Sequence, residues 1–304
     1  MSEFIFSNSL LKIYTNKNSS VFSRAGNSIS NEIKGRIGVI YDDFDYKGNL
    51  KESWKQYNLN HIFINAPRRL TISMDDKIQF HNVMKDSEYT PESYLNVNDV
   101  PDINSLYFVK KTGSTGGKGV NIYNHNDLLN VDVNNCVIQK NISNPDLYDN
   151  KRYKIRQLVL LYEKQVYIHK NSWFTRSNIN YNSILSDKLR DAHVISQKHD
   201  TIFELSNKLE NFDLIFKNMT LAVKDFTKYY QDKINNISGN IYGVLGFDFI
   251  VDNEYNVQII EINHRSNYAH PSNVSRDCDV KFFQDIILLM ARKIVPENLE
   301  IINR

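Results

Sequence analysis

The chain has 304 residues, of which 41% are hydrophobic and 24% charged, and its formal net charge is +2 at pH 7. This length and composition exclude a peptide-sized module and a disordered chain, and they predict one large domain or two to three small lobes with a substantial core. The near-neutral charge argues against nucleic-acid binding, which usually requires a clustered excess of lysine and arginine.

The cysteines and the N-terminus indicate the compartment. Cys136 and Cys278 lack the spacing of metal ligands and predict buried thiols in a reducing environment. The N-terminal segment lacks the basic region and long apolar core of a signal peptide, and the sequence contains no run of about 18 apolar residues. We therefore expect a cytoplasmic monomer that binds neither membranes nor nucleic acid.

The first third of the chain predicts short mixed elements. Residues 1–65 contain brief apolar runs between Asn, Ser and Gly connections, which indicates a small α/β lobe. Ser73 and Asp76 precede segment 77–84 and indicate the start of a helix, because acidic side chains in the first turn interact favourably with the helix dipole. This helix opens a second lobe.

Strand patterns dominate from Leu106 onward, as short runs rich in Val, Ile and aromatic residues. Three single strands are expected first, over 106–111, 119–123 and 136–142. Two hairpins are expected after them, one over 153–174 turning at Glu163-Lys164 and one over 242–263 turning near 253–256. Most of the second half is therefore predicted to be antiparallel sheet.

Two long amphipathic helices are also predicted from apolar residues spaced three and four apart. They cover 211–234 and 280–295. In the second, Arg292 and Lys293 suit the negative end of the helix dipole, and Pro296 marks the stop.

The stretch "KKTGSTGGKGV" at 110–120 contains four of the eleven glycines in the chain. It does not fit a P-loop, because no hydroxyl residue follows Lys118 and the flanking segments are strands. It does not fit the dinucleotide fingerprint either, because the third glycine is missing. Two interpretations stay open: a flexible hairpin loop that folds over phosphates with charge from Lys110 and Lys118, or a surface turn rich in Gly and Lys.

The second hairpin predicts a metal site. Side chains alternate faces along a strand, so a four-residue loop at 253–256 places Asp248 directly opposite Glu261, with Asn263 on the same face. Two facing carboxylates repel each other, so we expect a cation between them. Two carboxylates and an amide oxygen suit Mg²⁺. The alternative is a solvated acidic face of the hairpin.

The order of these motifs, with "QKNI" at 139–142 and a basic hairpin between the glycine loop and the acidic hairpin, resembles the ATP-grasp ligases. The similarity to the tubulin-tyrosine ligase family is closer and spans most of the chain. It rests on the segments "NSSVF", "TPESYL", "FVKKTGSTGGKGV", "QKNISNPDLYDNKRYKIRQLVLL", "FTRSNINY", "HVISQ" and "GFDFIVDNEYNVQIIEIN". It implies an α/β (α+β) fold of antiparallel sheets with flanking helices, and lobes at 1–65, 66–142 and 143–304. The nucleotide is expected between the central and C-terminal lobes.

The resemblance also implies site residues. Residues implied to bind ATP are Lys110, Gly113, Gly116, Gly117, Lys118, Gly119, Gln139, Lys140 and Ile142. Residues implied to hold Mg²⁺ are Asp248, Glu261 and Asn263. A catalytic role is implied for Lys110 at the phosphates and for Arg156 and Arg176 at the substrates, because a guanidinium is a permanent bidentate partner for a carboxylate or acyl phosphate. Arg265 is a further candidate. The alternatives are a solvated lysine at a strand edge and exposed arginines in salt bridges.

The reaction implied by the resemblance is carboxylate-amine ligation. A carboxylate attacks the γ-phosphate of ATP, and an amine converts the acyl phosphate to an amide with release of phosphate. This chemistry requires the protein to position the substrates and to neutralise their charge, and it does not require a nucleophilic side chain. The expected substrates are a free amino acid and a protein or peptide acceptor, with tubulin among the candidates.

Three positions depart from the family pattern. Ser73 stands where the family offers a lysine to the nucleotide, with Lys77, Arg68 or Arg69 as replacements. Lys154 stands where relatives carry an acidic residue, and Ser196 replaces an asparagine. Three functions therefore stay open: a ligase acting on proteins or peptides, a ligase of small molecules or free peptides, and a catalytically weakened ATP-binding scaffold.

Overall fold

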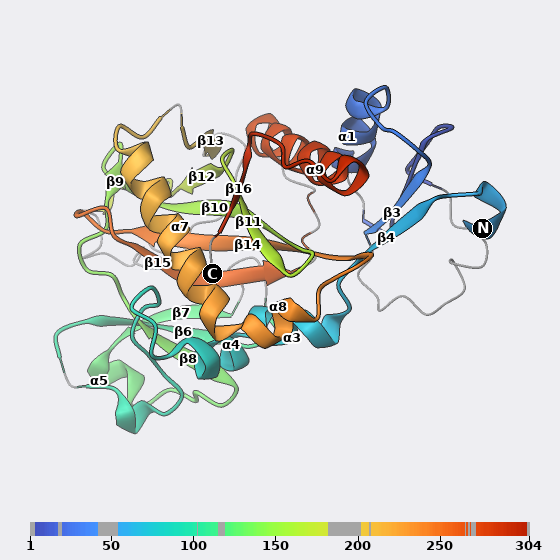
Figure 1. Cartoon of the computed structure of the whole chain (residues 1–304). Helices are drawn as coiled ribbons and strands as arrows, with labels where there is room; N and C mark the ends of the chain where they lie inside the picture. Colours follow the sequence, from blue (N-terminus) through green and yellow to red (C-terminus); the bar gives the residue numbers. More distant parts are fainter. Residues whose placement is uncertain are drawn as a thin grey trace.

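The computed structural model describes residues 4–17, 20–41, 54–101, 103–114, 119–181, 202–206, 208–264, 266, 268 and 272–302. Within these ranges the chain forms a mixed α/β fold with one sheet of twelve strands and a second sheet of four. Figure 1 shows the large sheet at the centre, with α7 on one side of it, α1 and α9 on the other, and the smaller sheet next to it.

The N-terminal strands belong to the large sheet. They are β1 (Phe6–Ser7), β2 (Leu11–Thr15), β3 (Ile37–Tyr41) and β4 (His61–Asn65), with α1 (Val21–Ile29) between β2 and β3. β2, β3 and β4 are mutually parallel, and β4 pairs in parallel with β14 (Ile241–Val251). The implied antiparallel arrangement is therefore wrong at this edge. Between β2 and β3 the helix α1 provides the crossover that lets consecutive strands run in the same direction.

The remainder of the large sheet is antiparallel. It contains β9 (Leu147–Tyr148), β10 (Lys151–Tyr162), β11 (Gln165–His169), β12 (Trp173–Arg176), β13 (Ile202–Glu204), β15 (Val257–His264) and β16 (Leu299–Ile301). The predicted turn at Glu163-Lys164 is confirmed, because Tyr162 pairs with Gln165. Both turn residues have positive φ, 50° and 62°, which is the geometry that two-residue hairpin turns favour.

Helices cover both faces of the large sheet. The face that carries Phe247 and Phe249 packs against α7 (Phe212–Tyr229), and the face that carries Leu158 and Leu160 packs against α1 and α9 (Asn273–Arg292). The central strands are thus buried on both sides. Among the described residues, no helix is long and apolar enough to cross a bilayer.

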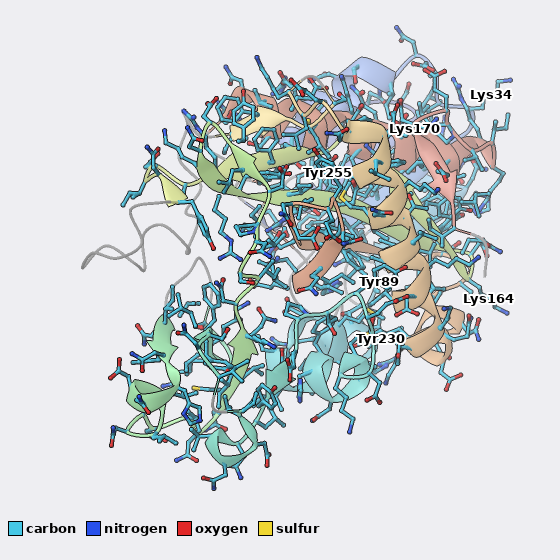
Figure 2. All side chains as sticks on the ribbon, turned by 90° about the vertical axis from the view of Figure 1, so that its left-hand side faces the viewer. Lys34, Tyr89, Lys164, Lys170, Tyr230 and Tyr255 are labelled. Atoms are coloured by element: carbon cyan, nitrogen blue, oxygen red, sulfur yellow. The ribbon has the colours of Figure 1, made fainter. Side chains whose placement is uncertain are left out.

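The predicted long helices are present with changed boundaries. Segment 211–234 breaks at Tyr230, labelled in Figure 2, where the backbone leaves helical geometry and a short helix α8 (Gln231–Asn235) follows. α9 begins before the expected residue 280, because the Ser272 side chain caps it by accepting a hydrogen bond from the Val274 N–H. It ends at Arg292 rather than at the predicted residue 295, where Lys293 takes a left-handed conformation with φ of 58° and caps the helix.

The smaller sheet has its own core, made by Tyr107, Val109, Leu128 and Ile138. Its strands are β5 (Ser93–Tyr94), β6 (Leu106–Lys111), β7 (Val120–Asn124) and β8 (Cys136–Lys140), with α5 (His125–Leu128) after β7. Two short 3-10 helices lie at Lys55–Tyr57 and Val97–Asp99. The division into three lobes stays a prediction.

Two helices link the sheets, α3 (Arg68–Asp75) and α4 (Lys77–Met84). Asp76 caps α4 by accepting a hydrogen bond from the Gln79 N–H at 3.0 Å, as the sequence predicted. Ser73 does not mark that start, because it lies inside the separate helix α3. The two helices bring their junction, residues 75–77, against β15 and the glycine loop.

Candidate active site

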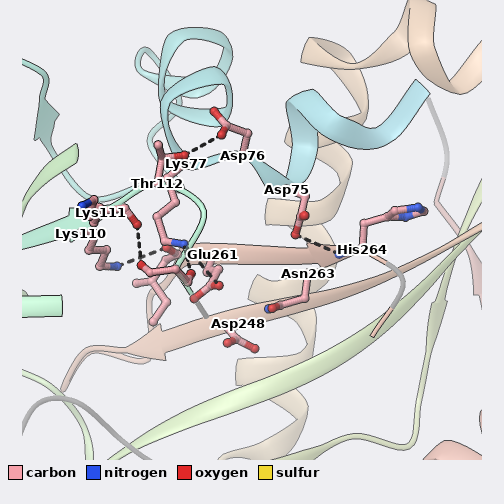
Figure 3. Close-up of polar contacts among 12 residues, drawn as sticks. Asp75, Asp76, Lys77, Lys110, Lys111, Thr112, Asp248, Glu261, Asn263 and His264 are labelled. Atoms are coloured by element: carbon pink, nitrogen blue, oxygen red, sulfur yellow. Dashed lines mark hydrogen bonds and ion pairs between the residues drawn. The ribbon is translucent and has the colours of Figure 1, made fainter. Parts of the chain in front are cut away.

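The β14–β15 hairpin places the predicted acidic residues together. Asp248 pairs directly with Glu261, as expected, although the loop is longer than predicted, because Val251 pairs with Val257. An irregularity next to Asp248 restores the register: Phe249 faces Ile259, so Ile260 is the extra residue of a β-bulge. Figure 3 shows Asp248, Glu261 and Asn263 near one another.

Asp248 is held by two cations of the protein. It is 1% exposed, and its Oδ1 accepts a hydrogen bond from Arg156 Nε at 2.5 Å. Its Oδ2 accepts from Lys154 Nζ at 2.8 Å and from Arg156 Nη2 at 3.3 Å. Burial raises the pKa of Asp248, but the charges of Arg156 and Lys154 outweigh burial and lower the pKa below its ordinary value. The carboxylate is therefore ionised at neutral pH.

Strand pairing explains how Arg156 and Lys154 reach Asp248. Arg156 on β10 is the register partner of Asp248 on β14, and Lys154 lies two residues away on the same face of β10. Gly246 leaves room for the guanidinium, because a Cβ there would lie 2.9 Å from Arg156 Nη1. Asn263 pairs with Gly246 and donates through Nδ2 to the Gly246 carbonyl at 3.5 Å, which leaves the amide oxygen as the acceptor.

Lys110 reaches the same region from the smaller sheet. Its side chain is buried, and Nζ donates to Gln139 Oε1 and to the Ile260 carbonyl, the latter at 3.3 Å. Burial lowers the pKa of Lys110 from 10.5 to about 8, against an upward effect of the Glu261 charge. The bulge at Ile260 thus connects the predicted phosphate-binding lysine to the acidic hairpin.

The glycine loop joins β6 to β7, as predicted. Gly113 and Gly119 have φ of 71° and 69°, a left-handed conformation that favours glycine. Thr112 Oγ1 donates to Asp76 Oδ2 at 2.6 Å, and the Ser114 carbonyl accepts from Lys77 Nζ at 2.9 Å, so the junction of α3 and α4 holds one side of the loop. The predicted residues Gly116, Gly117 and Lys118 lie outside the described residues, as do Arg265 and Ser196.

The junction of α3 and α4 supplies Asp75, which the motifs did not identify, and Lys77. Asp75 accepts a hydrogen bond from the His264 N–H at 3.2 Å (Figure 3), and burial raises its pKa despite that bond. Lys77 Nζ lies 3.9 Å from Glu261 Oε1. Of the three replacements considered for Ser73, Lys77 is the one with these contacts. One pocket that is open to solvent is lined by Lys77, Lys110, Gln139 and Glu261.

Arg152 is a second residue that the sequence reasoning missed. It lies at the start of β10, is 2% exposed and donates to Asn141 Oδ1 at 2.8 Å, within segment 139–142, which contains three of the residues implied to bind ATP. Burial lowers its pKa to about 10. The sequence signal for Arg152 was the run "KRYKIR" at 151–156. Arg152, Lys154 and Arg156 alternate along one strand, so their side chains share a face.

Other predicted residues lie differently. Lys140 pairs with Glu92 at 2.7 Å at the end of β8, and Ile142 is half-buried in the segment that follows. Arg176 is not brought to the cluster, because its register partner is Tyr153, on the opposite face of β10 from Arg156. It forms an ion pair with Asp149 and stacks near Tyr148 and Phe203. Its catalytic role stays a prediction.

The donor set fits a divalent ion in part. In the described part of the chain, no three His, Cys, Asp or Glu side chains gather as a metal site. The carboxylate of Glu261 and the amide oxygen of Asn263 could hold Mg²⁺, which is commonly bound by one or two protein ligands together with phosphates and water. Asp248 fits less well, because both of its oxygens already accept hydrogen bonds from cations.

Comparison with known proteins gives the family. The model of the tubulin-tyrosine ligase family matches residues 46–237 and 195–300. Two proteins of Tetrahymena thermophila are similar: tubulin glycylase 3B, 20% identical over 249 residues, and tubulin glycylase 3C, 23% identical over 214. These alignments cover 71% and 60% of this chain, but 21% and 20% of the relatives, so the chain spans about a fifth of their length. Because the family match extends over most of its residues, the chain belongs to the tubulin-tyrosine ligase family.

Proposed function

We propose that this protein is an ATP- and Mg²⁺-dependent ligase that joins an amino acid to a carboxyl group of a protein or peptide. The observation that carries the proposal is the excess of positive charge around Lys110 and Glu261. The cations are Lys77, Lys110, Arg152, Lys154 and Arg156, and they outnumber the acidic residues Asp75, Asp248 and Glu261. A partly buried cluster with such an excess suits a polyanion, and the triphosphate of ATP has that charge.

The fold supports an ATP-grasp arrangement, with the nucleotide between the smaller sheet and the β14–β15 hairpin. Lys110 would bind phosphate oxygens, with its ammonium held in place by Gln139. The glycine loop would close over the phosphates from its anchor at Asp76 and Lys77. The backbone of 139–142 would contact adenine. Neighbouring groups hold the Lys110 ammonium and, through Thr112 and Ser114, the described start of the loop.

Magnesium, when bound, would neutralise phosphate charge. Glu261 and Asn263 are the residues best placed to hold it, because their side chains share one face of β15. Arg156 would orient a substrate carboxylate as that carboxylate takes the γ-phosphoryl group of ATP. The incoming amine then displaces phosphate, so the chain's contribution is positioning and charge neutralisation.

The relatives guide the choice of substrates. Both are named tubulin glycylases, so tubulin is the first acceptor and glycine the first amino acid to test. A second candidate function, nucleotide binding without turnover, is favoured by one observation. Lys154 Nζ lies 2.8 Å from a carboxylate oxygen of Asp248, which weakens that residue as a metal ligand.

The test is ADP release from Mg²⁺-ATP with each of the twenty amino acids, with and without tubulin or acidic peptides, followed by mass spectrometry of the acceptor. Stimulation by one amino acid together with the matching mass gain is the expected result. If only a small molecule or a free peptide is modified, the proposed acceptor changes from a protein to that molecule. Nucleotide binding without stimulated ADP release would favour the scaffold, and no nucleotide binding would refute the proposal.

A further inference from the structure

The carboxylate of Asp248 is already neutralised by the chain itself. Arg156 engages both oxygens through two nitrogens, and Lys154 adds an ammonium at 2.8 Å from Oδ2. All three groups are largely buried, with Lys154 the most exposed at 17% of its side chain. Buried opposite charges in such contact are weakly screened by solvent and salt.

A divalent ion on Asp248 would have to compete with this arrangement. Mg²⁺ binds carboxylate oxygens at about 2.0–2.1 Å, so an ion on Oδ2 would share that oxygen with the Lys154 ammonium. Two cations on one oxygen repel each other strongly in a site shielded from water. Displacing Lys154 instead would require its ammonium to leave the carboxylate while Arg156 remained in place.

Glu261 and Asn263 are less tightly engaged by other groups of the protein than Asp248 is. Within the described ranges, the ion pair of Glu261 is with Lys77, whose Nζ is 3.9 Å away and beyond hydrogen-bond distance, and the Glu261 side chain is 29% exposed. Asn263 uses its amide nitrogen on the Gly246 carbonyl and keeps its oxygen for another partner. Glu261 and Asn263 are both partly exposed and have oxygens left to coordinate an ion.

We propose that the Lys154 ammonium occupies a cation position beside Asp248, so that the nucleotide-bound site takes one divalent ion, held by Glu261 and Asn263, rather than two. Lys154 is then a positioning residue: with Arg156 it fixes Asp248 as a structural anion and sets the number of metal ions. This inference rests on the proposed nucleotide binding, and it assigns Asp248 a role different from the one implied by the family resemblance.

The experiment counts Mn²⁺, a paramagnetic substitute for Mg²⁺, in the complex with a non-hydrolysable ATP analogue. With the protein in excess, electron paramagnetic resonance of the free ion gives the Mn²⁺ bound per nucleotide. The expected values are one ion for the wild-type chain and two for Lys154→Met, which removes the ammonium but keeps the length of the side chain. The control is Lys170→Met, which replaces an exposed lysine directly after β11 (labelled in Figure 2) and should retain one ion.

Two bound ions in the wild-type chain, or one ion in both the wild-type chain and Lys154→Met, would overturn the inference while leaving nucleotide binding intact. If Lys154→Met does not fold, Asp248→Asn answers the same question: the single ion should remain, and its loss would show that Asp248 is a ligand. Failure of the wild-type chain to bind the nucleotide analogue at all would overturn the proposed function, and this inference with it.

Discussion

Replacing Lys110 with methionine should change how the stability of the protein depends on pH. Burial lowers the pKa of Lys110 from 10.5 to about 8, although Glu261 acts in the opposite direction. Below pH 8 the ammonium is charged in both the folded and the unfolded chain, and the folded chain must hold it away from water. Between about pH 8 and 10.5 the unfolded chain alone keeps the proton, so this destabilisation fades as the pH rises.

The magnitude follows from the two pKa values. At 1.36 kcal/mol per pKa unit, a fall from 10.5 to about 8 corresponds to about 3 kcal/mol in the free energy of unfolding. Methionine does not ionise, so wild type should gain about 3 kcal/mol relative to Lys110→Met between about pH 7 and 10.5. The hydrogen bonds lost at Gln139 and Ile260 shift the two curves by a constant amount, because neither acceptor titrates.

Urea denaturation at 25 °C, repeated in steps across this pH range, measures the difference directly. Lys111→Met is the matched control, because Lys111 is the next residue along β6 and is exposed. Its curve should run parallel to that of the wild type. A Lys110→Met curve that also runs parallel would refute the assignment of Lys110 as a buried charge.

Three further variants test the site. Glu261→Gln should abolish Mg²⁺-ATP turnover without changing the circular dichroism spectrum, because it removes a negative charge and keeps the shape; ADP release at the wild-type rate would contradict its metal-binding role. Gly246→Ala should lower the free energy of unfolding by about 1–3 kcal/mol, because the methyl group would crowd Arg156 at 2.9 Å. Gly243→Ala, whose nearest contact is 3.3 Å, should cost less, and equal losses would rule out this explanation. Arg176→Ala should change nucleotide affinity by less than about twofold, since its ion pair lies on the other face of β10 and exposed pairs contribute little; a tenfold loss would restore it to the binding site.

Sequence patterns predicted the parts of the site that local geometry determines. Strand alternation placed Asp248, Glu261 and Asn263 on one face, and the structure confirms that Asp248 faces Glu261. The predicted loop was nevertheless one residue too short. A β-bulge at Ile260 offsets the longer loop, and no local pattern signals it, because bulges depend on how two strands pair.

The rest of the site depends on contacts between distant segments. Lys154 and Arg156 reach Asp248 because β10 pairs with β14, and motif order alone does not reveal that register. The same register separates Arg176 from Arg156, although both were predicted to face the substrates. Lys77 comes near Glu261 because the helices α3 and α4 connect the two sheets, a tertiary contact that no local pattern encodes.

The parallel pairing of β4 with β14 has a consequence for biosynthesis. Residues Ile64 and Asn65 pair with Ile241 and Tyr242, so the N-terminal strands must wait for a partner made much later. At about 5–20 residues per second, the ribosome needs roughly 10 to 35 s to make the intervening chain. The smaller sheet, complete by residue 140, can form during that interval. Until β14 is made, the unpaired edge of β4 is therefore open to pairing with another chain.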